Sequence, residues 1–216
     1  MKTKSEDKRL AILRAAFAVV TECGYSDTKV EDVAQRAGVA KGTVYLYFRD
    51  KPAIYIGLVG WLLEQALALL TGIRAERISP RAKLERVFEV WSTGVFSKPG
   101  VGALLSLENV DQSNTVMKRF RKQVLPRMHE VTGAVAEIIE EGIAGGEFRP
   151  VDPRLAAMMY MGAFSASMHG VTAGPSGPES AKSVEELFFC GLLARPKGHD
   201  RIVRRLGSCP RSKTRN

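Results

Sequence analysis

The chain of 216 residues is 45% hydrophobic and carries a formal net charge of +9, which suffices for one domain or two small ones and suits a polyanionic partner. Its three cysteines, Cys23, Cys190 and Cys209, match no metal-binding or redox spacing, and their odd number argues against a disulfide framework. We therefore expect a protein of the reducing cytoplasm, with no metal and no cofactor.

The charge is gathered at the two ends of the chain. Residues 1–51 carry a net charge of +3, residues 52–195 have equal numbers of acidic and basic residues, and residues 196–216 carry +6. The last segment is also poor in aliphatic residues, so we expect a disordered basic tail there. The chain is expected to divide into residues 1–50, residues 51–195 and this tail.

The first fifty residues predict three helices. The apolar stripe of the first helix recurs at three- and four-residue spacing, at Leu10, Leu13, Phe17 and Val20. Gly24 is expected to end this helix, because glycine adopts the left-handed conformation at little cost. Thr28 and Glu31 have the spacing of a capping box, which predicts a second helix that ends at Gly38. A third helix, residues 41–47, follows directly, and two short helices joined by a glycine-containing turn are typical of a helix-turn-helix.

The rest of the chain is also predicted to be helical. A fourth helix is expected to begin near Lys51, with Pro52 in its first turn, and to run past Leu69. Further helical segments are expected at residues 81–96, 102–111, 115–144, 153–173 and 179–194. Pro126 should kink the longest of them. Since no segment alternates as a strand does, the predicted fold is all-α, with a three-helix domain followed by a larger helical domain.

The third helix presents an unusual set of side chains to solvent. Val44 and Phe48 lie four residues apart and are expected to face inward. The outward set is then one cation, one hydroxyl and two phenols: Lys41, Thr43, Tyr45 and Tyr47. Lysines attract phosphates and hydroxyls hydrogen-bond them, while Gly42 lets the backbone approach closely. Such a face indicates docking against DNA.

The residues from Ile12 to Lys51 resemble, without a gap, the DNA-binding domain of the TetR family of bacterial regulators. The matching features are Gly24-Tyr25, Thr28, Val33-Ala34, Ala37-Gly38-Val39, Gly42-Thr43-Val44-Tyr45, Tyr47-Phe48 and Lys51. The match covers about a fifth of the chain. It implies a homodimer that binds double-stranded operator DNA through the helix-turn-helix of residues 1–50.

The resemblance also implies a role for each matching side chain. Thr28 and Lys51, at the starts of the second and fourth helices, would contact phosphate. The face of the recognition helix would consist of Lys41, Gly42, Thr43, Tyr45 and Tyr47. Simpler interpretations stay open: Thr28 could only cap a helix, the two tyrosines could pack partly into the core, and Lys51 could be a solvated charge.

The uncharged segment 155–173 has small residues at four-residue spacing, namely Gly162, Ala166 and Gly170. Such a ridge lets two helix backbones come close. The next helix has its own apolar stripe, which includes Leu187, Phe188 and Leu192. A membrane span is the alternative, but Ser165, Ser167 and His169 would be costly in lipid. We expect no membrane association, and the resemblance implies that these two helices form the dimer interface.

The resemblance places a small-molecule pocket inside residues 51–195. An apolar pocket with a few polar groups is the general expectation. The candidate lining residues, each of a type that is more often plain core, are Trp91, Phe96, Phe120, Met128, Tyr160 and Phe164. No nucleophile elbow, phosphate-binding glycine loop or zinc-protease motif is present, so we expect no enzyme. The leading hypothesis is a repressor released from a palindromic operator by a small, largely apolar effector. Control by a protein partner, or action as an activator, is the alternative.

Overall fold

The computed structural model describes residues 4–98, 101, 104, 114–168 and 178–193. Within these ranges the regular elements are helices, and one isolated β-bridge joins Phe148 to Leu193. The predicted all-α class is therefore confirmed. The predicted tail 196–216 lies outside the described residues, as does the predicted helix 102–111 apart from Leu104.

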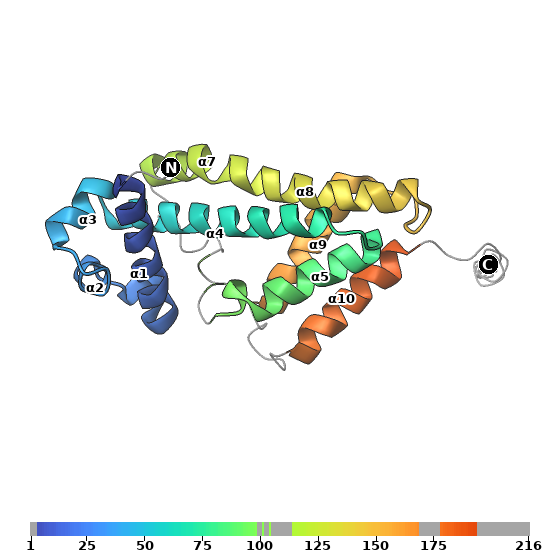
Figure 1. The fold of residues 1–216 in the computed structure, drawn as a ribbon, viewed down its shortest axis with the longest axis horizontal. Helices are drawn as coiled ribbons and strands as arrows, with labels where there is room; N and C mark the ends of the chain where they lie inside the picture. The colour runs from blue at the N-terminus through green and yellow to red at the C-terminus, as the bar shows by residue number, and fades with distance from the viewer. Residues whose placement is uncertain (1–3, 99–100, 102–103, 105–113, 169–177, 194–216) are drawn as a thin grey trace, which may run out of the picture.

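Three helices form a head at one end of an elongated molecule, namely α1 (Lys4–Asp27), α2 (Val30–Arg36) and α3 (Lys41–Tyr47) (Figure 1). Gly24 ends the regular part of α1 with φ of 81°, and Gly38 forms the turn after α2 with φ of 66°. Both values lie in the left-handed region that glycine adopts without a steric penalty. The predicted turns and the predicted bounds of the third helix are thus confirmed.

The predicted capping box at the start of α2 is wrong. Since α2 begins at Val30, Lys29 occupies the N-cap position and makes no side-chain capping bond. Thr28 lies one residue too early to cap, and it is buried. Its hydroxyl donates to the carbonyl of Gly24 at 2.7 Å, so it closes the turn between α1 and α2.

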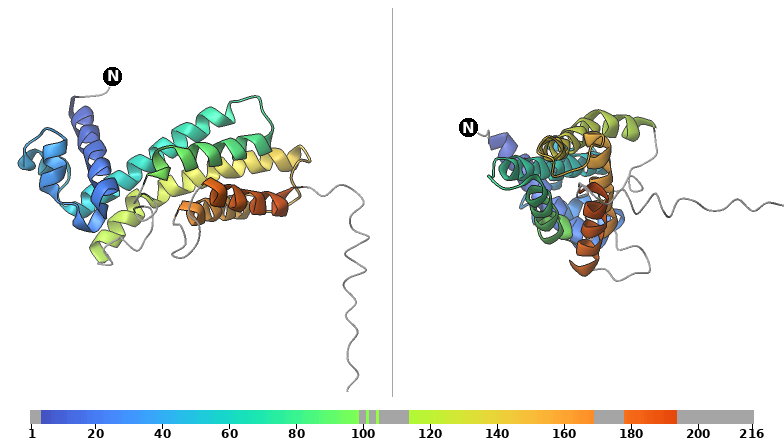
Figure 2. Two further views of the ribbon diagram at one scale, coloured as in Figure 1. Left: turned by 90° about the horizontal axis from the view of Figure 1, so that it is seen from below. Right: turned by 90° about the vertical axis from the view of Figure 1, so that its right-hand side faces the viewer.

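The described residues from Lys51 onward form the body of the molecule. The body is built around α4 (Lys51–Arg74), which runs from the head along most of the molecule (Figure 1). Two helices lie beside it and run in the same direction, α7 (Asn114–Gln123) and α8 (Leu125–Ala144). On the other side (Figure 2), α5 (Pro80–Thr93) packs against both α4 and α8, and α9 (Pro153–Met168) packs against α8. The 3-10 turn η1 (Val95–Ser97) packs on α5, and α10 (Pro178–Leu192) packs on α9 and α5.

The segment predicted as one helix over 115–144 is two helices that meet at Val124, where φ is −100° and ψ is −45°. Pro126 follows two residues later. Its ring removes a backbone donor and clashes with the preceding turn, which is the expected cause of a bend. The predicted kink is confirmed, and it lets α7 lean toward the start of α4.

Most of α4 is apolar on every side, as expected for a helix surrounded by others. It is the one helix among the described residues that is long and apolar enough to cross a membrane, and 61% of its most apolar window is buried inside the protein. The neighbouring helices supply that cover. A buried lysine joins α5 to α8: Lys83 of α5 donates to both carboxylate oxygens of Glu141 on α8, at 3.0 and 2.8 Å.

Candidate nucleic-acid interface

Two buried side chains orient α3. Val44 is fully buried, and Phe48, which follows the last turn, is buried against α4. The fit at this contact depends on Gly57, because a Cβ atom there would lie 2.8 Å from the ring of Phe48. The guanidinium of Arg9 covers the same ring at 5.5 Å. The inward placement predicted for Val44 and Phe48 is therefore confirmed, and the opposite side of α3 is left to solvent.

The solvent side of α3 carries the predicted outward residues to different degrees. Lys41, Gly42 and Tyr45 are exposed, whereas Thr43 and Tyr47 are half-buried. The structure adds one residue that the prediction missed, since Leu46 is 83% exposed. The exposure of Leu46 could have been predicted from its spacing, because a residue two positions from both Val44 and Phe48 lies on the opposite side of the helix from them. An exposed leucine beside an exposed phenol suits contact with thymine methyl groups.

Lys41 is held by a neighbouring acid in the free protein. Its Nζ donates to Oε1 of Glu31 on α2 at 2.5 Å and lies 5.8 Å from the centre of the Tyr45 ring. The hydrogen bond from Lys41 lowers the pKa of Glu31, and the same bond raises the pKa of Lys41. Both side chains are about half exposed to water. A DNA phosphate would therefore compete with Glu31 for the ammonium group.

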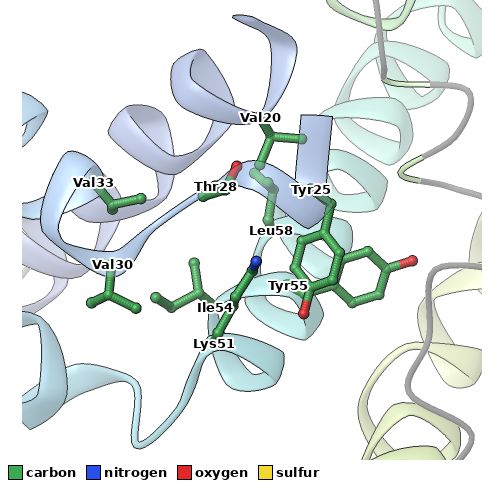
Figure 3. Close-up of a pocket in the computed structure, with 9 residues that line it drawn as sticks. All are labelled: Val20, Tyr25, Thr28, Val30, Val33, Lys51, Ile54, Tyr55 and Leu58. Carbon is green, nitrogen blue, oxygen red and sulfur yellow. The ribbon is translucent and has the colours of Figure 1, made fainter. Parts of the chain in front are cut away.

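Lys51 and Thr28 meet where the head joins the body. Lys51 Nζ donates to the carbonyl of Ser26 at 2.8 Å and lies 4.8 Å above the ring of Tyr25. The two predicted phosphate-binding residues line a small pocket between α1, α2 and α4 (Figure 3). Its other lining residues are Val20, Tyr25, Val30, Val33, Ile54, Tyr55 and Leu58. In this conformation both side chains hold α1 to α2 and α4, so their phosphate contacts stay a prediction.

The interior of the body gathers four of the six predicted pocket residues into one aromatic cluster. Trp91 lies 5.8 Å from Phe96 and 5.2 Å from Phe164, measured between ring centres, and Phe88 bridges Phe164 to Tyr160. All of these rings are buried. The indole Nε1 of Trp91 is buried too and has no hydrogen-bond partner among the described residues, which costs free energy unless an acceptor is supplied.

The other two predicted pocket residues lie elsewhere. Phe120 is buried, but it stacks on Tyr55 of α4 with ring centres 6.5 Å apart, near the head. Met128 is 38% exposed on α8. Periodicity marks a residue as apolar and inward but does not say which helix it meets, so these two could not be separated from the cluster by sequence.

Two polar groups border the aromatic cluster. The hydroxyl of Tyr160 donates to the carbonyl of Leu84 at 2.7 Å, and burial raises the pKa of Tyr160 well above its ordinary value. Burial, reinforced by the charge of Glu85, raises the pKa of Glu185 on α10 to about 7. Within the described part of the chain, Oε1 of Glu185 is buried without a hydrogen-bond partner. Trp91 Nε1 and Glu185 Oε1 are thus a donor and an acceptor that no described residue uses.

Both parts of the chain match models of known families. Residues 12–58 match the bacterial regulatory proteins of the tetR family, and residues 78–189 match the tetracyclin repressor-like C-terminal domain. The second match alone covers more than half of the chain. The protein belongs to the TetR family. As a member it is a DNA-binding regulator and not an enzyme, as predicted.

Named TetR-family relatives cover most of the chain. The fatty acid metabolism regulator protein of Bacillus subtilis is 30% identical over 156 residues, which span 72% of this chain and 78% of that protein. The regulator RutR of Escherichia coli K12 is 29% identical over 184 residues, or 84% of this chain and 83% of RutR. The structure of FadR from Bacillus subtilis, solved with stearoyl-CoA, has a TM-score of 0.62 and 26% identity over 84% of this chain and 98% of that one.

In this TetR-family protein, α9 and α10 carry a stripe of exposed apolar side chains. Its members on α9 share one side of the helix and are Leu155, Met158, Met159, Gly162 and Ala166. On α10, Leu187 is 75% exposed. Two further predicted interface residues pack inside the chain, since Phe188 lies against Tyr160 and Leu192 is buried. Gly170 lies outside the described residues.

No group of three or more His, Cys, Asp or Glu side chains among the described residues is placed to hold a metal ion. The chemistry of the described part is that of binding surfaces: an aromatic and basic face on α3, an apolar stripe on α9 and α10, and an aromatic interior between them.

Proposed function

We propose that the protein is a cytoplasmic repressor that binds a palindromic operator as a homodimer and is released by a small, largely apolar effector. In this proposal residues 1–50 bind DNA, and residues 51–195 bind the effector and the second subunit. The observation that carries it is the solvent side of α3, where Lys41, Tyr45 and Leu46 stand exposed on a helix held by two buried anchors.

The apolar stripe on α9 and α10 supports the homodimer. A contiguous exposed apolar patch on a soluble protein marks an interaction surface, and small residues such as Gly162 and Ala166 allow close approach of a second pair of helices. A two-fold dimer would present its two α3 helices to half-sites about 34–36 Å apart, one turn of B-DNA. Leu187, which is 75% exposed on α10, is the natural residue to test.

The aromatic interior supports an effector with an apolar body and at least one hydrogen-bond acceptor. The rings of Trp91, Phe96 and Phe164 would surround the body, and Nε1 of Trp91 would donate to the acceptor. FadR of Bacillus subtilis, similar in sequence and fold, was solved with stearoyl-CoA. A long-chain acyl-CoA is therefore the first compound to test here.

Binding to the DNA upstream of the gene, compared with unrelated DNA at one salt concentration, tests the proposal. The double variant Thr43→Ala/Tyr45→Ala should lose the preference for the upstream fragment, because it removes a hydroxyl and a phenol from the DNA-facing side. The matched control Leu69→Ala/Thr71→Ala changes exposed residues of α4 far from α3 and should keep the preference. Equal binding of the wild-type protein to both fragments would contradict an operator in this region.

Stearoyl-CoA added to the operator complex tests the effector. Release of DNA by the wild-type protein but not by Trp91→Phe would support the proposed interior site, because phenylalanine keeps an aromatic ring without the N–H. Release that needs a second protein instead would favour control by a partner.

A Leu187→Asp variant that stays dimeric in sedimentation would exclude the proposed interface.

A further inference from the structure

An ion pair between Arg119 of α7 and Asp50 holds the start of α4. Arg119 donates from Nη1 to Oδ1 of Asp50 at 3.2 Å and from Nη2 to Oδ2 at 3.1 Å. Asp50 is the N-cap of α4, and its Oδ1 also accepts from the backbone N–H of Ala53 at 2.7 Å. Burial alone would raise the pKa of Asp50, but the hydrogen bonds from Arg119 and Ala53 outweigh burial and lower it. The carboxylate is therefore ionised and held at two points.

Asp50 is close to the DNA-facing helix along the chain. α3 ends at Tyr47, and only Phe48 and Arg49 lie between it and Asp50. Phe48 is buried against Gly57, so this short link has little freedom. A force that fixes Asp50 therefore also fixes the end of α3.

The next residue of α7, Phe120, holds the start of α4 at a second point. Phe120 stacks on Tyr55, about one turn further along α4, and Tyr55 donates its hydroxyl to the carbonyl of Leu104 at 2.6 Å. Tyr55 also lies 4.8 Å from Tyr25, near the end of α1, measured between ring centres. Consecutive residues of one helix in the body thus hold the two first turns of α4 and, through Tyr25, the head.

Among the described residues, three arginine–carboxylate pairs connect α4 and its N-cap with α7 and α8, and they differ in exposure. The pairs of Glu64 with Arg127 and of Arg74 with Glu137 lie further along α4, and their arginine side chains are 42% and 40% exposed. Arg119 is only 19% exposed. Water and salt screen the exposed pairs, which makes them weak. The shielded, two-point pair at Asp50 is the one suited to fix a position.

Asp50 also carries a negative charge beside a surface proposed to meet phosphates. Arg49, which is 63% exposed, donates from Nε to Oδ2 of Asp50 at 3.1 Å and is free to turn toward solvent. If Arg49 moves to a phosphate, Arg119 stays as the cation that neutralises Asp50. Loss of Arg119 would leave this carboxylate to repel the DNA backbone.

We infer that Arg119 is a positioning residue for DNA recognition, which fixes the end of α3 from the body through Asp50. The inference rests on the proposed operator binding, but the rigidity of the link between α3 and α4 can be measured without DNA. Its signature is twofold: Arg119 and Asp50 act as one unit in operator affinity, and loss of Arg119 loosens the start of α4.

The test is a double-mutant cycle with a matched control. Arg119→Met, Asp50→Asn and the double variant are compared with Arg127→Met, Glu64→Gln and their double variant. Asparagine is a good N-cap, so Asp50→Asn keeps the cap of α4. Each full-length protein is titrated with the operator and with unrelated DNA, and hydrogen exchange is followed for the peptides that cover residues 41–56. Circular dichroism checks that each variant is folded.

We expect Arg119→Met to lower operator affinity about tenfold, with the double variant no weaker than the weaker single one, as for residues in contact. Arg119→Lys should not restore full affinity, because one ammonium cannot make both bonds. Affinity for unrelated DNA should fall less than operator affinity, because repulsion from Asp50 acts on any phosphate backbone whereas the placement of α3 matters for base recognition. The Arg127 cycle should leave operator affinity within twofold.

Additive losses from Arg119→Met and Asp50→Asn, or equal losses from Arg119→Met and Arg127→Met, would overturn the inference. Unchanged hydrogen exchange over residues 41–56 in Arg119→Met would also overturn it, whatever the DNA shows. If the wild-type protein does not prefer the operator but Arg119→Met speeds exchange there, the operator proposal fails while the positioning of α3 by Arg119 stands.

Discussion

Replacing Glu31 by glutamine would reveal whether a carboxylate on the head restrains its attraction to DNA. In the free protein Glu31 holds the ammonium group of Lys41 at 2.5 Å, and the hydrogen bond keeps the pKa of the acid below its ordinary value. The acid is therefore ionised at neutral pH. Because both side chains are about half exposed, the pair adds little to folding, and we expect the melting temperature to change little.

The size of the effect follows from counterion release. Each phosphate that a protein neutralises on B-DNA adds about 0.9 to the slope of log affinity against log salt concentration. If Glu31→Gln frees Lys41 for one more phosphate, the slope steepens by about 0.9, so a fourfold rise in salt weakens the variant by a further factor of about 3.5. Since phosphates carry no sequence information, affinity for unrelated DNA should rise as much as affinity for the operator.

Fluorescence anisotropy of a labelled duplex over a fourfold range of salt measures this slope. Glu85→Gln is the matched control, because it removes the carboxylate from a comparably exposed ion pair with Arg81, 2.7 Å long, on α5 in the body. Both variants gain the same net charge. Equal slopes for Glu31→Gln and the wild-type protein, or an equally steeper slope for Glu85→Gln, would refute the argument that Glu31 masks Lys41.

Three further changes have outcomes that the structure determines. Burial raises the pKa of Glu185 to about 7 from an ordinary value of 4.5, so the folded state binds more protons between these values and this group makes stability fall as pH rises through them. Glu185→Gln should raise the free energy of unfolding at pH 8 by only about 1 kcal/mol, since water still partly screens this half-buried side chain, and no gain over the wild-type protein in urea would contradict this. Gly142→Ala would place a Cβ atom 2.2 Å from the buried ring of Phe148 and should cost about 1–3 kcal/mol, whereas Gly133→Ala, with open space, should not destabilise in the same thermal melt. Leu46→Ala should leave the melting temperature unchanged but weaken operator binding about fivefold through the loss of an apolar contact, so an unchanged operator Kd would remove Leu46 from the interface.

The sequence predicted the helices well because helix formation is written in local patterns. The glycine turns at Gly24 and Gly38 and the kink at Pro126 each depend on a few neighbouring residues, and the structure confirms them. The predicted stripe of α1 is confirmed in part: Leu13 and Val20 are buried, whereas Leu10 and Phe17 are only partly covered. The capping box failed on a single residue of offset: a threonine at Thr28 suits a cap, but the turn after Gly24 uses its hydroxyl first. Element boundaries are sensitive to such competition for one hydrogen bond.

Contacts between distant helices could not be predicted in the same way. Phe120 and Trp91 have the same apolar character, yet one meets Tyr55 near the head and the other meets Phe164 in the interior. The pair of Arg119 with Asp50 joins residues 69 positions apart. Periodicity gives the side of a helix on which a residue lies, and only the packing of the helices decides which partner it meets.

The length of α4 explains how contacts around Trp91 and the ion pair of Arg119 with Asp50 could both act on DNA binding. A helix of 24 residues is about 36 Å long. α4 runs from its N-cap Asp50, which pairs with Arg119 of α7, to Arg74, which pairs with Glu137 of α8, and α5, the helix that carries Trp91, packs against it. A tilt of about 5° around its far end would move its start by about 3 Å, which is comparable with the length of a hydrogen bond to a phosphate. An effector that changes the packing around Trp91 need therefore distort no residue of the head. It need only favour a slightly different angle of α4, and Arg119, which leans on the same helix from α7, would determine whether α3 follows that angle as a rigid body.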